Sequence, residues 1–449
     1  MRKHRAAAAS LLLLLGAALA GARAADHDGP RRVVIFIGDG MGLTTVTLGR
    51  LAAERLKRPY AFDRFNVLGL ASTRSADCVV TDSAAAATAL SSGYKTKNGF
   101  LGVDPELRPR RTLLELARGA GFATGLVTTT RITHATPAGY AAHVADRDSE
   151  EKIADQYLEG DVDVLMGGGR RTMDARHQDA LRAKGYTVVT DAKGLRAAKP
   201  GGRLAGVFAE EHMSYEIERD PAREPSLREM TEKALDILSR DGRPFVAMIE
   251  GGRIDHAEHE HDASALVREQ LAFADAIDAA LERVERQGDL LVLVTADHAT
   301  GGVAISEKLD LDGLLAAKAA TETVALAHHP EALGFADFKK LLEDDFGVSP
   351  TEKDLEAVHA SKSPPWAMGH LVSLRRGVSF YDVDFQCECA GTHGHEGSLV
   401  PVFAAGKGAE SFAGTYENTR IALEVSRLLG LPAPGSPLSG PSKRYYRVL

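Results

Sequence analysis

Six continuous apolar runs constrain the fold of this chain more than any other feature. They are RVVIFIGDG from Arg32, GFATGLVTT from Gly121, VDVLMGGG from Val162, RPFVAMIEGG from Arg243, GDLLVLVTADH from Gly288 and SLVPVFAAG from Ser398. Apolar runs of this length, without polar alternation, are typical of parallel strands covered on both faces. Because helical patterns alternate with them, the sequence predicts an α/β fold with a mostly parallel central sheet and helices on both faces.

The clearest helical patterns cover residues 44–56, 111–121, 224–240 and 263–288, and the last two are long and amphipathic. Between about 309 and 389 the alternation of strand and helix weakens, and the only tryptophan, Trp366, lies there. We interpret this stretch as an insertion before the last core strand, located near the mouth of a site or at a subunit contact.

The N-terminus has the pattern of a signal peptide. A basic MRKHR segment precedes the apolar AAAASLLLLLGAALA, and ARA at 22–24 is a small-residue cleavage site. We expect cleavage after Ala24 and export to the periplasm or the medium. No cysteine directly follows the cleavage site and no apolar tail ends the chain, so the sequence predicts no membrane anchor.

The net charge of the chain argues against some classes of binding partner. The formal net charge is −8, and it becomes −12 without the four basic residues of the leader. This acidic balance favours neither nucleic acid nor an anionic membrane as a partner. An anionic substrate would therefore require a local cluster of cations. The three cysteines, Cys78, Cys387 and Cys389, leave one unpaired or joined to another chain in an oxidising compartment, and no bridge is predicted.

Chemically reactive side chains follow five strand-like segments, the fifth being CVVTD around Val79 and Val80. These side chains are Asp39, Ser83, His134 with Thr136, Glu250, and Asp297 with His298. Ligands of open α/β sheets bind beyond the carboxyl ends of the strands. A single polar residue at a strand end is weak evidence, since turns are polar, but all of these on one edge predict a site.

The segment EGGRIDHAEHEHD adds metal-ligand chemistry. Asp255 and His259 are four residues apart and share one face if the segment is helical. Carboxylates with imidazoles suit a zinc-class ion, although a solvated polar surface is an equally good interpretation of this segment alone. We assign Glu260 and His261 to such a surface.

A later pair of histidines, His393 and His395, stands just before the last strand. With it, the potential ligands suffice for more than one ion, and sites with several metals most often hydrolyse phosphate esters.

The segment VVTDSAAAATALSSG permits two roles for Ser83. Asp and Ser are common at helix starts, and alanine is the best helix former, so a capping role is the simplest interpretation. A serine at a helix N-terminus is also placed where backbone N–H groups favour an anion. The two roles are compatible, with Asp82 as the supporting residue.

Taken together, these segments resemble the alkaline phosphatase family. The matching motifs are IGDGMG, VTDSAAAATALSSGYKTKNG, TTTRITHATPAGYAAHVADR, IEGGRIDHAEH, VTADHATGG and HEGSLVPVFAAG, in the order of the family and spanning about residues 31–410. The resemblance implies one catalytic domain over 25–449 that hydrolyses phosphate monoesters through a phosphoserine. It also implies a homodimer.

Position by position, the resemblance implies a nucleophile at Ser83 and a phosphate-binding arginine at Arg147. It implies one zinc ion on Asp255, His259 and His395, with His393 as a neighbour of this site. A second zinc ion is implied on Asp297 and His298. Asp39 bridges from it to a third metal with Thr136 and Glu250, where His134 also lies.

The third metal is less defined. Some members of the family have aspartate at the position of His134, lysine at that of His256, and magnesium in the third site, whereas other members share the two histidines of this chain. The resemblance therefore leaves magnesium, zinc and cobalt open, and imidazole favours an ion softer than magnesium.

Two other functions remain as alternatives. Enzymes with a related core cleave phosphodiesters, sulfate esters or phosphonates, or move phosphate within a sugar acid, but the TDSAAAATAL segment together with Arg147 favours monoesters. A nucleotide-binding or metal-binding module without catalysis is a weaker alternative, because IFIGDGMG lacks the G-x-G-x-x-G spacing.

Overall fold

A single ten-stranded sheet organises the protein. The computed structural model describes residues 29–199, 201–381 and 391–436. The strand order is β14-β2-β13-β8-β1-β7-β3-β4-β6-β5, and only β13 runs antiparallel to its neighbours. The predicted α/β class with a mostly parallel sheet is confirmed.

Each of the six apolar runs overlaps a strand of this sheet. These strands are β1 (Arg32–Gly38), β3 (Ala123–Arg131), β4 (Val164–Gly168), β7 (Phe245–Gly251), β8 (Leu290–Thr295) and β13 (Val400–Gly406). The sequence analysis did not predict four shorter strands, β2 (Val67–Ser72), β5 (Tyr186–Val189), β6 (Arg203–Val207) and β14 (Gly414–Glu417). They lie toward the two sides of the sheet, where strands need not be apolar throughout.

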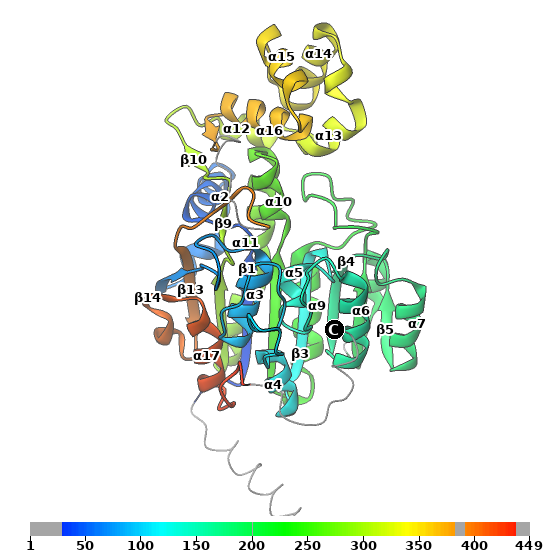
Figure 1. Cartoon of the computed structure of the whole chain (residues 1–449), viewed down its shortest axis with the longest axis vertical. Helices are drawn as coiled ribbons and strands as arrows, with labels where there is room; N and C mark the ends of the chain where they lie inside the picture. The colour runs from blue at the N-terminus through cyan, green and yellow to red at the C-terminus, as the bar shows by residue number, and fades with distance from the viewer. Residues whose placement is uncertain (1–28, 200, 382–390, 437–449) are drawn as a thin grey trace, which may run out of the picture.

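Helices cover both faces of the sheet (Figure 1). In one layer α11 (Ala263–Gln287) packs against α2 (Leu43–Arg55) and α9 (Leu227–Leu238), and in the other α3 (Ser83–Ser92) packs against α4 (Leu113–Gly119) and α17 (Thr419–Leu428). The remaining helices beside the sheet are α5 (Ala135–Ala138), α6 (Glu150–Gly160), α7 (Ala175–Ala183), α8 (Ala192–Ala197) and α10 (Arg253–His259). Each of the four predicted helices is present.

Five helices form a cap above the carboxyl edge of the sheet, in yellow and orange in Figure 1. They are α12 (Leu311–Ala316), α13 (Thr321–His328), α14 (Phe335–Phe346), α15 (Glu352–Ala360) and α16 (Pro364–Arg375). A hydrophobic cluster of their own, with Phe338, Leu342 and Met368 fully buried, holds α13 to α16 together. This helical cap occupies most of the stretch that the sequence marked as an insertion.

One expected strand is absent. The stretch around Val79 and Val80 is irregular, and Val79 is 76% exposed. A short loop therefore delivers Ser83 to the edge, because two valines followed by turn residues are too short a run to define a strand. Cys78 in this loop is disulfide-bonded, whereas Cys387 and Cys389 lie outside the described residues.

Candidate metal centre and nucleophile

Three groups of metal-ligand atoms lie at the carboxyl edge of the sheet. In each group the candidate ligand atoms are within 4.8 Å of one another. The first group is Asp255, His259 and His395, the second Asp39, Asp255 and His298, and the third Asp39, His134 and Glu250. Asp39 and Asp255 each belong to two groups, so the three form one continuous centre.

The first group joins α10 to a short β-ladder. Asp255 and His259 share one face of α10, with Asp255 Oδ2 3.2 Å from His259 Nε2. His395 begins β12 (His395–Glu396), which pairs with β9 (Ala299–Thr300) directly after β8. The Nδ1–H of His395 donates to the Thr81 carbonyl at 2.9 Å, so its Nε2 presents a lone pair, 3.1 Å from His259 Nε2.

The second group follows β1 and β8. Thr300 Oγ1 donates to Asp255 Oδ1 at 2.7 Å and lies 3.1 Å from His298 Nδ1, which fixes the proton of His298 on Nδ1 and leaves Nε2 free to bind a metal. Asp297 Oδ2 is 3.3 Å from the same Nε2. The rings of His298 and His395 stack 3.7 Å apart, so the first and second groups are adjacent.

The third group lies between β7 and the start of α5. Glu250 is fully buried in β7 and accepts a hydrogen bond from Thr128. Thr136 in α5 is also fully buried, and its hydroxyl has no hydrogen-bond partner among the described residues. His134 accepts a hydrogen bond from Arg147 at Nε2, 3.1 Å away, while its buried Nδ1 has no hydrogen-bond partner among the described residues.

Ser83 is the first residue of α3 and faces the second group. Its hydroxyl lies 3.3 Å from His298 Nε2. Asp82 is the N-cap, and its carboxylate accepts from the Ala85 N–H at 2.9 Å and from Arg147 Nη1 at 3.1 Å. Burial opposes the charge on Arg147, yet Asp82 and Asp39 hold the pKa of its guanidinium above its ordinary value. The same aspartate thus starts the helix and orients the arginine.

Burial destabilises the charged forms of the ionisable side chains in this centre. Burial raises the pKa of Asp297 to about 7, and the charge of Asp255 adds to this effect. Burial also raises the pKa of Glu250 to about 7 and that of Asp39 well above its ordinary range, the latter with repulsion from Asp297 and Asp255. It lowers the pKa of His298 to about 4. Bound cations would relieve both costs, since they favour carboxylates and neutral imidazoles.

The polar atoms without partners fit such cations. Both oxygens of Asp39, Oδ2 of Asp297 and Oε1 of Glu250 are buried without a hydrogen bond within the described ranges. A buried carboxylate oxygen in this state carries a large desolvation cost. The donor set of oxygens and imidazole nitrogens is that of zinc-class and harder divalent ions, so the residues fit metal ions.

The structure corrects one assignment. His261 is only 3% exposed, not part of a solvated surface as predicted, because its ring stacks on Phe380.

His393 is exposed, whereas His395 is buried within the first group. His256 is not in any of the three groups, and its Nδ1 lies 2.7 Å from Arg253 Nη1.

Sequence reasoning also missed supporting residues. Thr300 orients two ligands, and His212 packs its ring 4.4 Å from that of His256. Thr300 follows His298 by two residues in the same motif, a signal that could have been used. No sequence pattern near His212 indicates a role for it at the site.

Comparisons with known proteins identify the family of this chain. The family model described as Alkaline phosphatase matches residues 30–431. The chain is 34% identical to alkaline phosphatase 3 of Bacillus subtilis, covering 90% of each chain. It is 32% identical to the repressible alkaline phosphatase of Saccharomyces cerevisiae, covering 91% of this chain and 83% of that one.

A solved structure supports the same relationship. The alkaline phosphatase of Thermus thermophilus is similar to this chain with a TM-score of 0.81 and 30% identity, covering 90% of this chain and 93% of that one. The family match spans nearly the whole described chain and includes all three metal-ligand groups. The chain therefore belongs to the alkaline phosphatase family, whose members are metal-dependent phosphomonoesterases.

Proposed function

We propose that this enzyme hydrolyses phosphate monoesters through a phosphoserine at Ser83. The observation that carries the proposal is the position of the Ser83 hydroxyl, which lies at the N-terminus of α3 and 3.3 Å from His298 in the second metal-ligand group. Backbone N–H groups and the helix dipole at this end favour the negative charge of an attacking oxygen and of the phosphoserine. Metal ions at the three groups would neutralise phosphoryl charge and acidify the serine hydroxyl and water.

Residues of the chain bind the phosphoryl group, and the reaction proceeds in two steps. Arg147 offers two parallel N–H donors to two phosphoryl oxygens, and Asp82 holds its guanidinium in place. In the first step the Ser83 oxygen bonds to phosphorus, the bond to the ester oxygen breaks, and the alcohol leaves with a proton. In the second step water attacks phosphorus, the bond to Ser83 breaks, and inorganic phosphate and the serine hydroxyl are formed.

We propose zinc ions at the first two groups and Mg²⁺, Zn²⁺ or Co²⁺ at the third. Two imidazoles in the first group and one in the second favour zinc. The third group is mainly carboxylate, but His134 adds a nitrogen that suits a softer ion. Structures of histidine-to-glutamate and histidine-to-aspartate variants of the TAB5 alkaline phosphatase are described with magnesium in the site called M3, which supports Mg²⁺ as one candidate for the third group.

The test combines Ser83→Ala with chelation. We expect Ser83→Ala to lower kcat for 4-nitrophenyl phosphate by about a thousandfold or more, because a covalent route without its nucleophile is lost. A chelator should abolish activity and added Zn²⁺ with Mg²⁺ should restore it. Ser92→Ala is the matched control, since Ser92 ends the same helix and donates only to the Thr88 carbonyl.

Acid-quenched enzyme should carry phosphate on Ser83, detected by peptide mass spectrometry. Wild-type activity in Ser83→Ala, or faster cleavage of bis(4-nitrophenyl) phosphate than of the monoester, would overturn the proposal.

We also propose that the chain is exported after removal of residues 1–24, has its catalytic domain over 25–449 with an insertion at about 309–389, and acts as a homodimer. Among the described residues no helix is both long and apolar enough to cross a membrane. N-terminal sequencing of the exported protein and light scattering of the purified enzyme test the leader and the dimer.

A further inference from the structure

A large groove is lined mainly by residues of the helical cap and also by residues at the metal centre. Its volume is about 970 Å³, and α15 and α16 form one wall. His259, a candidate ligand of the first group, and His393 also line the groove. A groove of this size holds a small organic molecule, and the transfer of a phosphoryl group alone does not require it.

The cap wall of the groove is aromatic and aliphatic. Trp366 stacks on His370 with ring centroids 5.2 Å apart and an angle of 16° between the planes. The ring of His261 also contacts the indole, with the ring centroids 4.8 Å apart and the planes tilted by 51°. Leu371 and Leu374 extend the wall, and the side chain of Leu374 is 54% exposed. Flat aromatic groups bind favourably to such a surface.

Charges at the rim do not select for a charged ligand. Lys362 contributes one exposed cation, while Glu260 and Asp354 contribute two carboxyls. Asp354 is already paired with Arg375 Nη2 at 2.6 Å and accepts the N–H of Thr351, the N-cap of α15. The groove thus combines an apolar wall with opposing charges, a chemistry that suits an uncharged ring better than a second anionic group.

The groove has a fixed position relative to the metal ligands. Only three residues separate His259 from the start of α11, and His261 among them has a φ of 52°, in the left-handed region. Ser373 Oγ on α16 donates to the His261 carbonyl at 2.7 Å. α16 also packs so closely here that a Cβ at Gly369 would lie 2.0 Å from the Glu260 carbonyl oxygen. These contacts tie the aromatic wall to the helix that carries His259.

The geometry of in-line displacement also directs the leaving alcohol toward this groove. In-line displacement requires the leaving oxygen to lie opposite the attacking oxygen. Ser83 contacts His298 of the second group, and the adjacent first group contains His259, which lines the groove. The alcohol bonded to a phosphoryl group between the two groups would therefore extend into the groove.

We propose that the groove is the binding site for the alcohol portion of the substrate and that it selects phosphate monoesters of uncharged, planar aromatic alcohols. The inference rests on the proposed function of Ser83 and the metal centre. Trp366 is its main specificity-determining residue, because its indole is the largest ring of the wall.

The kinetic test compares benzyl phosphate with ethyl phosphate, whose leaving alcohols have similar acidity. In the wild-type holoenzyme we expect benzyl phosphate to have the higher kcat/KM. Trp366→Ala should reduce the ratio of the two kcat/KM values by about fivefold, the size of one aromatic contact. Trp366→Phe, which keeps a ring, should retain most of the preference.

Leu326→Ala is the matched control. Leu326 belongs to α13 of the same cap and is 63% exposed, but it does not line the groove, so its substitution should leave both kcat/KM values unchanged. An unchanged ratio in Trp366→Ala would overturn the groove proposal. If the wild-type enzyme hydrolysed neither ester, the proposed function itself would fail.

A binding measurement provides a readout besides activity. Trp366 is the only tryptophan of the chain, so tryptophan emission reports directly on the groove. Benzylphosphonate, which cannot be hydrolysed, should shift or quench the emission of the wild-type holoenzyme, and ethylphosphonate should not. Competitive inhibition by benzylphosphonate without any change in emission would place the ring elsewhere and contradict the proposal.

Discussion

Two fully buried aspartates, Asp104 and Asp39, show how differently this protein treats the same residue. Asp104 accepts hydrogen bonds from Arg108 Nε at 2.6 Å and from Arg110 Nη2 at 2.5 Å. Arg110 Nε at 3.0 Å and the backbone N–H groups of Glu106 and Arg108 also donate to it. Burial alone would raise the pKa of Asp104, but these donors hold it below its ordinary value.

Asp39 has the opposite environment. Neither of its oxygens has a hydrogen-bond partner within the described part of the chain, and its charged neighbours include Asp297, Asp255 and Glu250. Where the chain supplies the compensating cations, as at Asp104, a buried carboxylate is structural. Where the chain supplies mostly further carboxylates, the compensating cations must come from outside, and the site is functional.

The largest expected effect is a loss of activity when Asp39, but not Asp104, is substituted. Asp39→Asn should lower kcat/KM for a phosphate monoester by at least about a hundredfold, because Asp39 belongs to two ligand groups and even supporting residues of metal sites have effects of this size. Bound metal, measured by elemental analysis, should fall in parallel. The metal-free variant should be no less stable than the metal-free wild type, since one repelling charge is removed. A marked loss of stability would contradict the comparison.

Asp104→Asn should instead lower the stability of the protein and leave its activity unchanged. We expect a loss of about 2 kcal/mol of unfolding free energy at neutral pH, because a buried carboxylate with two arginine partners is replaced. The folded pKa is below the ordinary value, so the stabilisation is present above about pH 4 and is lost as the pH falls through the folded pKa. Urea unfolding of the metal-free proteins measures both effects. Activity per folded molecule should stay at the wild-type level, and its loss would show that Asp104 is not purely structural.

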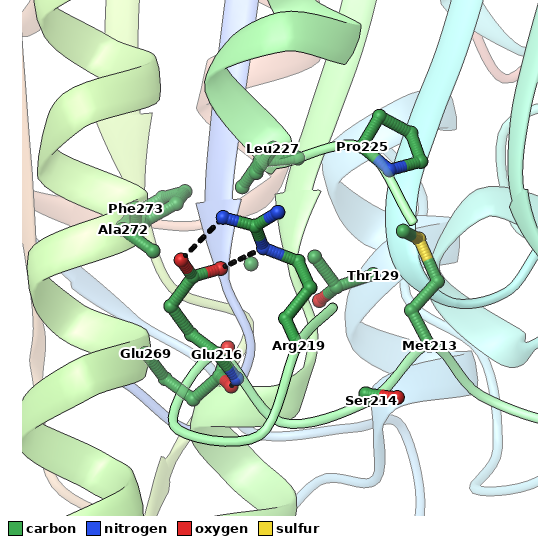
Figure 2. Close-up of a pocket in the computed structure, with 11 residues that line it drawn as sticks. Thr129, Met213, Ser214, Glu216, Arg219, Pro225, Leu227, Glu269, Ala272 and Phe273 are labelled. Atoms are coloured by element: carbon green, nitrogen blue, oxygen red, sulfur yellow. Dashed lines mark hydrogen bonds and ion pairs between the residues drawn. The ribbon is translucent and has the colours of Figure 1, made fainter. Parts of the chain in front are cut away.

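The smallest expected effect concerns a carboxyl of intermediate character, Glu269 (Figure 2). It is buried on α11, lines a cavity of about 10 Å³, and accepts the Glu216 N–H at 2.6 Å, while Arg219 pairs with Glu216 instead. Burial raises its pKa to about 8. Its contribution to stability is therefore complete below about pH 4 and is lost as the pH rises towards 8.

Glu269→Gln keeps an acceptor for the Glu216 N–H but cannot ionise. At pH 9 the metal-free variant should be more stable than the metal-free wild type by about 1–2 kcal/mol, and the difference should shrink towards pH 5. Thermal unfolding across this range is the measurement. Glu285→Gln, on the same helix at a side chain that is 70% exposed, is the control and should change little. A difference that is independent of pH would mean that Glu269 is already ionised at pH 5 in the folded protein, so that burial does not raise its pKa.

The parts of the fold that the sequence predicted depend on local patterns. The apolar run from Arg32 forms β1 because both faces of that strand are covered, and the spacing of Asp255 and His259 matches one helix face. The stretch around Val79 was wrongly predicted as a strand. The short strand β5 was missed, since a four-residue segment carries little pattern.

The sequence by itself determined which side chains stand at the carboxyl edge, because strand order along the chain and the polar turns after each strand are encoded locally. Only the tertiary structure decided that Asp255 belongs to two groups and that Thr300 contacts both Asp255 and His298. It also buried His261 against a cap helix more than a hundred residues away, with His261 Nδ1 3.1 Å from His370 Nδ1. Such contacts join segments distant along the chain, and no local pattern of residues encodes them.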